Sequence, residues 1–357
     1  MVTVSTEFKI EKIKSSKIEI VDWDNIGFGR FYSDHMFMAD CENGKWKNGQ
    51  ILPFQNLEFS PAMSSIHYGQ SIFEGMKAFL NPQGKAQLFR PEKNLERFNK
   101  SALRMGMPEV PHDFFMKSIE TLVDLDKAWI PRKRGSALYI RPFMFATDRF
   151  IGVKPSENFR FMVITCPVDA YYSEPVKVFV ADKYVRAFEG GVGEAKAAGN
   201  YAATMMPVVE AKKNGFDQIL WMDPVQFKYA QEIGTMNVFF IIDGTAITPR
   251  LNGAILEGIT RDSILQVLRD KGFPCEERDI SIDELVDAHK NGKLQDAFGS
   301  GTAATISHIS CLGYKDMILD LPDVESRNVS NMIKKELGDI KTGYIEDKHN
   351  WVYPLER

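Results

Sequence analysis

Lys196 stands in a segment that could carry covalent chemistry. It lies in GVGEAKAAGNYAATMMP, residues 191–207, where its neighbours are Gly, Ala and other uncharged residues apart from Glu194. Most lysines keep their ammonium group in water, so an exposed loop lysine is the ordinary interpretation. Small neighbours would instead let other groups approach closely. A lysine that attacks a carbonyl must be deprotonated, which a nearby cationic ligand favours.

A phosphate-binding site is the second candidate. In LEGITRD, Gly258, Ile259 and Thr260 lead into a predicted helix at 260–272, with Thr260 as the expected N-cap. The first N–H groups of a helix and the positive end of its dipole can hold an anion, although Thr caps without a ligand are common. FGSGTAAT, residues 298–305, fits either a ligand-binding turn or an ordinary tight turn.

The nucleotide-binding loops do not fit these letters. GxGxxG would require a glycine where Lys196 stands, and a P-loop would require Gly-Lys-Ser/Thr, whereas Lys196 lies between Ala195 and Ala197. A lysine combined with a phosphate site instead suggests pyridoxal phosphate, whose aldehyde forms a Schiff base with lysine.

Glu232 is the candidate partner of that cofactor's pyridine nitrogen. The ring withdraws electrons only while this nitrogen is protonated, so a buried carboxylate must face it. Glu232 stands in an otherwise uncharged stretch between Lys228 and Asp243. A surface glutamate is the alternative interpretation.

The elements that must position these residues are those of a mixed α/β protein. Periodicity and turn signals predict strands or hairpins at 35–46, 77–89, 136–146, 158–168, 176–182, 218–223 and 236–249, and helices at 91–106, 113–131, 201–213 and 260–272. A chain of 357 residues exceeds the roughly 250–300 at which one core stops growing. We therefore expect two domains, at 1–172 and 179–357, joined by a connector at 173–178.

Composition excludes several functional classes. The net charge of −4 gives no basic field that would attract nucleic acid or an anionic membrane. The sequence also has no run of 18 apolar residues, which is the length needed to span a bilayer. The four cysteines, which are far apart and not clustered with histidine, predict no metal site. The N-terminal residues lack the apolar core of a secretory signal, so a cytoplasmic location is expected.

Six segments of the sequence resemble a known family. SSIHYGQSIFEGMKAF, LYIRPFMF, EAKAAGNYAATMMP, QEIGTMNVFF, LNGAILEGITRDSIL and GSGTAAT, in order from about Asp34 to Ile309, resemble the fold type IV pyridoxal-phosphate enzymes. The closest resemblance is to the branched-chain amino-acid aminotransferases. It implies a two-domain fold with a small N-terminal α+β domain and a larger C-terminal cofactor domain.

The resemblance implies roles for individual residues. Lys196 would be the Schiff-base lysine and would move the α-proton, Tyr201 would face the ring oxygen, and Glu232 would hold the pyridine nitrogen. The phosphate would be bound by Arg97, Ile259, Thr260 and Thr302. Arg97 has another explanation as the partner of a nearby glutamate.

The substrate-binding residues also follow from the resemblance. Arg141 would receive the distal carboxylate of glutamate. The remaining expected substrate-binding residues are Phe28, Tyr68, Phe73, Tyr139, Tyr171, Thr235 and Ala303. Without the family, aromatic residues at such positions are usually plain core.

The implied reaction moves the amino group of L-leucine, L-isoleucine or L-valine to 2-oxoglutarate, in a homodimer whose interface Tyr68 would approach. A D-amino-acid aminotransferase, an aminodeoxychorismate lyase, or a non-catalytic phosphate- or nucleotide-binding protein are the alternatives. Animal members continue GSGTA with a redox-active Cys-x-x-Cys pair, where this chain has Ala304 and Ser307.

Overall fold

The computed structural model describes residues 5–169 and 174–355. The chain folds into two compact units. Unit 1 comprises Met1–Tyr171, Ala195–Gly199 and Asp339–Arg357, and unit 2 comprises Tyr172–Glu194 and Asn200–Gly338. We expected a connector at 173–178. Residue 173 lies outside the described residues, and strand β10 (Val176–Val180) already occupies the end of that connector.

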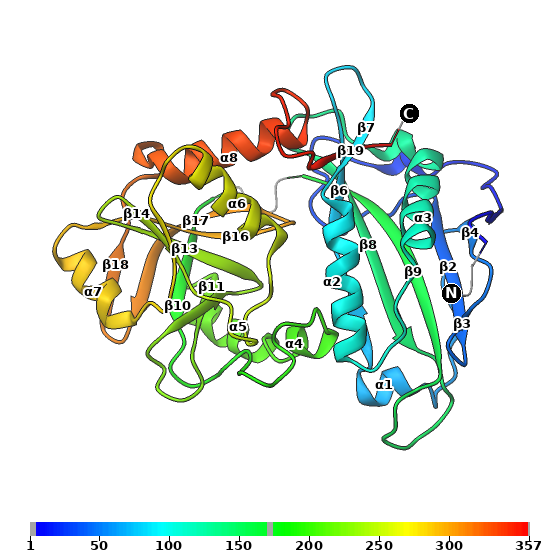
Figure 1. The fold of residues 1–357 in the computed structure, drawn as a ribbon, viewed down its shortest axis with the longest axis horizontal. Coiled ribbons are helices and arrows are strands. Elements are labelled where there is room, and N and C mark those ends of the chain that lie inside the picture. The colour runs from blue at the N-terminus through cyan, green and yellow to red at the C-terminus, as the bar shows by residue number, and fades with distance from the viewer. Residues whose placement is uncertain (1–4, 170–173, 356–357) are drawn as a thin grey trace. The chain divides into compact units, whose positions relative to one another are not determined.

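Unit 1 is built on one mixed sheet (Figure 1). Its main path runs β1-β4-β2-β9-β8-β6-β7-β19, with β3 paired to β2 and β5 paired to β8. The strands are β1 (Lys9–Ile10), β2 (His35–Glu42), β3 (Lys45–Trp46), β4 (Gln50–Pro53), β5 (Ser71–Phe73), β6 (Met76–Leu80), β7 (Ala86–Phe89), β8 (Ala137–Ala146), β9 (Asn158–Val168) and β19 (Val352–Pro354).

Helices α2 (Pro91–Arg104) and α3 (His112–Leu125) cover this sheet. α2 buries Leu95, Phe98 and Ala102, which lie three and four residues apart and therefore share one helix face. The ring of Phe98 packs on Phe115 of α3 and Phe161 of β9, with centroids 5.9 and 5.7 Å away. The short helix α1 (Ser64–Tyr68) precedes β5.

Unit 2 contains a second sheet that closes on itself. Its path is β12-β11-β10-β17-β16-β13-β14-β15, and the additional pairing of β12 with β13 closes the strands from β12 through β13 into a ring. Besides β10, the strands are β11 (Gln218–Met222), β12 (Ala230–Ile233), β13 (Met236–Ile242), β14 (Thr245–Thr248), β15 (Cys275–Glu277), β16 (Leu294–Gly301), β17 (Thr305–Tyr314) and β18 (Met317–Asp320).

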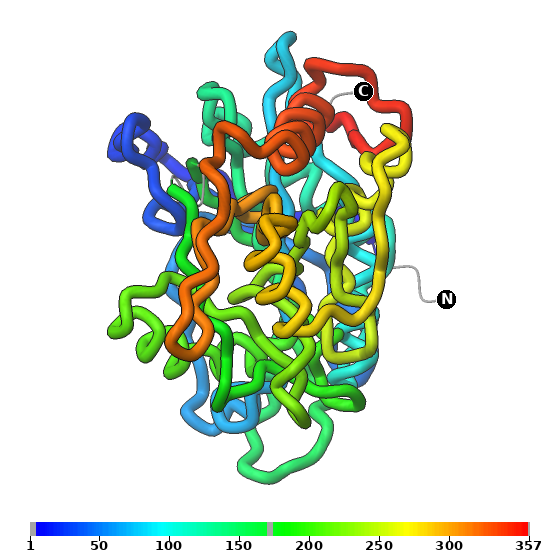
Figure 2. The backbone as a smooth tube through the Cα atoms, turned by 90° about the vertical axis from the view of Figure 1, so that its left-hand side faces the viewer, coloured from blue at the N-terminus to red at the C-terminus, as the bar shows by residue number. Residues whose placement is uncertain are grey.

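Helices of the second half of the chain are α4 (Ala198–Ala202), α5 (Met205–Lys213), α6 (Ile259–Asp270), α7 (Ile282–Lys290) and α8 (Asn328–Lys341). Helices α6 and α7 pack on β16, and the trace of this region is seen in Figure 2. Three short 3₁₀ turns occupy Ile18–Ile20, Lys127–Trp129 and Val324–Ser326. No helix in the described ranges is both long and apolar enough to cross a bilayer.

The predicted strands and hairpins are confirmed, but three helix predictions were wrong in detail. The helix expected at 113–131 ends at Leu125, and Lys127–Trp129 form a separate 3₁₀ turn. The expected helix at 201–213 is two helices, α4 and α5, because a continuous helix would place Pro207, which lacks an N–H, against the carbonyl of Ala203. α6 begins at Ile259, so Gly258 is its N-cap and Thr260 is already helical. The expected stop at Gly272 is confirmed by its positive φ of 65°.

Two segments expected in the C-terminal domain pack with unit 1. Ala197 forms a β-bridge with Ile72 beside β5, and β19 pairs with β7. Backbone hydrogen bonds to sheet edges therefore place residues 195–199 and the end of the chain in this unit.

Candidate functional site

Lys196 is fixed by its own backbone. Its N–H donates to Ser101 Oγ at 2.9 Å, and its carbonyl accepts from the Phe73 N–H at 3.1 Å. The first bond ties it to α2 and the second to β5. Its ammonium nitrogen lies 5.0 Å from the centroid of the Phe73 ring. These two bonds fix the position of the Lys196 backbone between α2 and β5.

An arginine and three aromatic rings lie together with Lys196 in unit 1. The Arg141 guanidinium lies 4.6 Å from the Phe73 ring centroid and 5.2 Å from that of Tyr139. Its Nη2 donates to Tyr139 Oη at 2.9 Å, and Phe28 packs edge-on against Tyr139 with centroids 5.0 Å apart. The predicted residues thus form an apolar wall with one cation in it.

Gly75 makes room for this wall. A Cβ at this position would overlap with the hydroxyl of Tyr139. The glycine of the FEG motif is therefore required by the close approach of the aromatic ring.

Arg97 is buried and pairs with Glu74, a residue that sequence reasoning missed. Arg97 Nε donates to Glu74 Oε1 at 2.7 Å and Nη2 donates to Oε2 at 3.0 Å. Oε2 also accepts from Asn94 Nδ2 at 2.8 Å and from the Gly75 N–H at 3.0 Å. Although burial opposes ionisation, Arg97, Lys196 and the Gly75 N–H hold the pKa of Glu74 below its usual value.

The alternative explanation for Arg97, that it pairs with a glutamate, is thus partly met. This partner is a fully buried residue that lies between β5 and β6. A bidentate, desolvated pair fixes the plane of the guanidinium. The signal in the sequence is the single carboxylate of SIFEGMKAF.

Glu232 is buried in β12 of unit 2 and is held on both oxygens. Oε2 forms an ion pair with Arg186, and Oε1 accepts from Asn237 Nδ2 at 3.1 Å. Glu232 and Arg186 line one small cavity together with Tyr201 and Thr235. The full lining of this cavity is Arg186, Asn200, Tyr201, Thr204, Glu232, Gly234, Thr235 and Leu256. The expectation of a buried carboxylate at 232 is therefore met.

The N-terminus of α6 follows a glycine. Gly258 is the N-cap, with φ −73° and ψ 123°, and the first helical N–H groups belong to Ile259 and Thr260. A Cβ on Gly258 would overlap with Asn237 Oδ1, the same amide whose Nδ2 supports Glu232. Thr302 and Ala303 lie in the turn between β16 and β17.

The structure divides the predicted residues between its units. Unit 1 holds Lys196, Arg97, Arg141 and the aromatic wall, whereas unit 2 holds Tyr201, Glu232, Thr235, Ile259, Thr260, Thr302 and Ala303. Tyr68 lies on α1 and is 42% exposed. Tyr171 lies outside the described residues.

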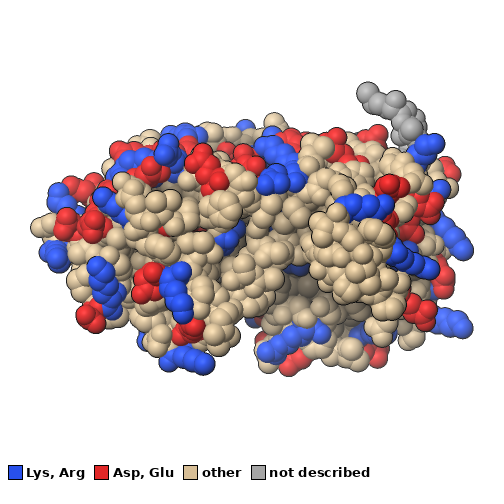
Figure 3. Space-filling model, turned by 90° about the horizontal axis from the view of Figure 1, so that it is seen from below, with Lys and Arg blue, Asp and Glu red and all other residues tan. Residues whose placement is uncertain are grey.

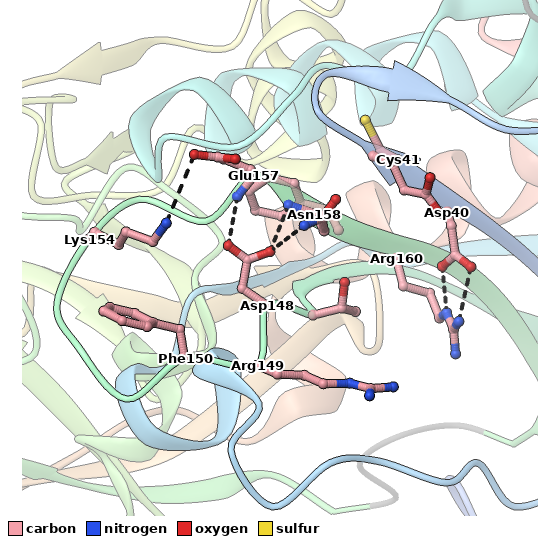
Figure 4. A pocket seen from close by; sticks show the side chains of 12 residues that line it. Asp40, Cys41, Asp148, Arg149, Phe150, Lys154, Glu157, Asn158 and Arg160 are labelled. Carbon is pink, nitrogen blue, oxygen red and sulfur yellow. Dashed lines mark hydrogen bonds and ion pairs between the residues drawn. The ribbon is translucent and has the colours of Figure 1, made fainter.

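A second cavity, of about 590 Å³, lies elsewhere in unit 1 (Figure 4). Its charges are largely paired: Arg160 donates to Asp40, and Asp148 accepts from Asn158 and the Glu157 N–H. None of the predicted site residues lines it.

On the face drawn in Figure 3, basic and acidic side chains are interspersed. Within residues 5–169 and 174–355, no group of three or more His, Cys, Asp or Glu side chains is arranged to hold a metal ion.

Comparison with known proteins identifies the family. Residues 71–310 match the amino-transferase class IV family. A probable branched-chain-amino-acid aminotransferase of Staphylococcus epidermidis is 42% identical over 353 residues, which is 98% of each chain. Branched-chain-amino-acid transaminase 1 of Bacillus subtilis is 41% identical over 92% of this chain and 94% of its own. The chain belongs to the class IV aminotransferases.

Solved structures support the fold. The branched-chain amino acid aminotransferase of Escherichia coli has a TM-score of 0.74 at 23% identity, over 91% of this chain and 99% of its own. That of Thermoproteus uzoniensis, solved with norvaline, has a TM-score of 0.74 at 24% identity over 89% and 99%. The predicted fold type IV architecture is confirmed.

The cofactor of this family is pyridoxal 5′-phosphate, as predicted. The residues present fit it. A buried carboxylate and a phenol line one cavity, helix α6 begins after a glycine in the same unit, and the backbone of Lys196 is anchored among small residues. Buried Arg186 Nε also has no hydrogen-bond partner among the described residues, as expected for a cavity lining that meets a ligand.

Proposed function

We propose that this enzyme is a branched-chain amino-acid aminotransferase, which moves the amino group of L-leucine, L-isoleucine or L-valine reversibly to 2-oxoglutarate. The observation that carries the proposal is the wall of Phe28, Phe73 and Tyr139 with Arg141 set into it. Aliphatic side chains bind to aromatic surface, whereas a second carboxylate needs a cation. The names of the relatives support the same substrates.

The bound cofactor supplies a carbonyl for the amino group and a ring that withdraws electrons from the substrate Cα. Lys196 would hold the cofactor covalently. Once the amino group of the substrate has displaced it, its Nζ would take the proton from Cα and deliver it to the former carbonyl carbon of the cofactor. Glu232 would accept a hydrogen bond from the ring nitrogen, and Tyr201 would donate one to the ring oxygen.

We assign phosphate binding to Arg97, Ile259, Thr260 and Thr302. The Nε and Nη2 groups of Arg97 donate to Glu74, and this pair sets the plane of the guanidinium that would meet the phosphate. The N–H groups of Ile259 and Thr260 add the positive end of the α6 dipole.

On the substrate side, Arg141 takes the distal carboxylate of glutamate and 2-oxoglutarate. The other proposed substrate contacts are Phe28, Tyr68, Phe73, Tyr139, Tyr171, Thr235 and Ala303.

A homodimer is part of this proposal. Exposed apolar side chains in unit 1 include Ile66 and Tyr68 of α1, and Ile151 and Val153 of the loop between β8 and β9, the last being 90% exposed. A bond from the Ser64 N–H to the Asp148 carbonyl joins α1 to the start of that loop. A second copy of the chain would cover this apolar surface. Sedimentation should give a dimer that Val153→Asp weakens; a wild-type monomer would contradict it.

We also propose a cytoplasmic location. All four cysteines are free thiols, as is usual in a reducing compartment. Cell fractionation tests this.

The direct test of function is glutamate formation by the cofactor-loaded enzyme with 2-oxoglutarate. We expect turnover with L-leucine, L-isoleucine and L-valine and little with D-alanine. Preference for D-alanine, or release of pyruvate from aminodeoxychorismate, would favour the other fold type IV activities. A protein that binds phosphate but stays colourless with the cofactor would favour the non-catalytic alternative.

A further inference from the structure

Arg186 lines the cavity of unit 2 beside Glu232, and no sequence motif pointed to it. Its side chain is 7% exposed and that of Glu232 is 4% exposed, so the ion pair between Arg186 Nη2 and Glu232 Oε2 is largely shielded from solvent. In such surroundings the attraction of unlike charges is much stronger than in water.

Other contacts hold Arg186 in place independently of Glu232. Nη2 donates to the carbonyl of Ala254 at 2.5 Å and approaches that of Gly193 at 3.4 Å. A Cβ on Gly193 would overlap with the Ala254 carbonyl, so these two loops pack backbone against backbone. The cation therefore stays at this point of the cavity.

Glu232 is also oriented by a second residue. Asn237 Nδ2 donates to its Oε1 at 3.1 Å and to the Leu256 carbonyl at 2.9 Å. Since Asn237 already fixes the direction of the carboxylate, what Arg186 adds is mainly positive charge. A positive charge beside a carboxylate favours its ionised form.

We propose that Arg186 is a positioning residue that keeps Glu232 ionised, so that the proton shared by Glu232 and the cofactor's ring nitrogen stays on the nitrogen. Without this charge the proton would move to a Glu232 oxygen, and the neutral ring would withdraw electrons less strongly. The change transfers one proton between nitrogen and oxygen and breaks no other bond. The inference rests on the proposed role of Glu232.

The test uses holoenzyme loaded with pyridoxal phosphate that carries ¹⁵N in the ring. The ¹⁵N chemical shift separates protonated from neutral nitrogen, and it is read without substrate, so it does not depend on which amino acid the enzyme uses. We expect the protonated position in wild type and in Arg186→Lys, which keeps the charge. Arg186→Gln, which keeps a donor but no charge, should move the shift toward the neutral position.

Kinetics supply a second readout. The single-turnover rate with leucine should fall about tenfold or more in Arg186→Gln and recover in Arg186→Lys. A protonated ring in folded Arg186→Gln would overturn the proposal. If that variant does not fold, the wild-type enzyme provides the test. Its ¹⁵N shift should stay constant between about pH 6 and 9, and a titration of the ring nitrogen within that range would overturn the inference.

Discussion

At the scale of single residues, Phe73 contacts both Lys196 and Arg141 in unit 1. Its ring centroid lies 5.0 Å from Lys196 Nζ and 4.6 Å from the Arg141 guanidinium, and its N–H binds the Lys196 carbonyl. One aromatic residue therefore helps to place both the proposed cofactor lysine and the proposed carboxylate-binding arginine. The electron-rich faces of the ring suit this position between positive charges.

Replacing Lys196 tests the covalent role. Lys196→Ala should fold and should bind the cofactor without attaching to it, because the backbone bonds that hold this residue remain. After borohydride reduction, mass spectrometry should find cofactor on the wild-type peptide and none on the variant, and leucine turnover should nearly vanish. Lys154→Ala, in the second cavity, is the matched control. A Lys196→Ala enzyme that kept about a tenth of wild-type turnover would refute the assignment.

Replacing Arg141 tests how dicarboxylates are bound. Arg141→Gln should weaken the half-reactions of glutamate and 2-oxoglutarate by about 1.5–3 kcal/mol and affect leucine less, because only the former bring a second carboxylate. Stopped-flow rates for each half-reaction measure this, with Arg149→Gln as control. Equal losses for leucine and glutamate would show that Arg141 does not discriminate between them.

Sequence reasoning singled out Lys196 and Glu232 because each is a charged residue in an unusual local setting. It missed Glu74 and Arg186 for a physical reason. Their partners stand 23 and 46 positions away, and only the fold brings the charges together. No local spacing in the sequence predicts such pairs.

At the scale of elements, turns and hairpins were the most predictable. Asn43 and Gly44, with φ 50° and 73°, form the expected turn between β2 and β3. The errors came where several local rules compete. At the start of α6, Gly258 replaces the expected Thr260 as N-cap, and here a close approach to Asn237 also requires the glycine.

His308 on β17 is expected to make the stability of the fold depend on pH. Burial, with Lys334 and Arg327 nearby, lowers the pKa of His308 from 6.5 to about 4, and neither ring nitrogen has a hydrogen-bond partner among the described residues. Below pH 6.5 the unfolded state binds the proton more readily, so stability falls as pH drops from 6.5 toward 4. The loss is about 3 kcal/mol at most.

Urea unfolding between these pH values measures this effect, because it gives the free energy of unfolding at each pH. His308→Leu should flatten the slope of that free energy over this range. The same slope in His308→Leu and wild type would mean that other groups control the acid sensitivity.

At the scale of the whole molecule, the local pattern predicted two units but not their full membership. Residues 195–199 join unit 1 through the bridge of Ala197 to Ile72, and β19 joins through β7, far away in sequence. An extended segment can add to many sheet edges, and the sequence of the strand alone does not select one.

The thiols of the whole chain bear on regulation. Burial raises the pKa of Cys41 and Cys166 to about 11 and raises that of Cys311 as well, and all four cysteines are free. With Ala304 and Ser307 in place of a cysteine pair, mild peroxide should leave leucine transamination largely intact, since thiolates are the reactive form. Inactivation that dithiothreitol reverses, and that Cys311→Ser abolishes, would reveal thiol control.

The most direct test of the central claim is the visible absorbance of the cofactor-loaded enzyme during two successive additions. L-Leucine should remove the absorbance of the bound aldehyde form and release the corresponding 2-oxo acid. 2-Oxoglutarate should then restore it, with one glutamate formed per site, while D-leucine should do neither. An absorbance that L-leucine leaves unchanged, or that 2-oxoglutarate does not restore, would contradict the assignment as a branched-chain aminotransferase.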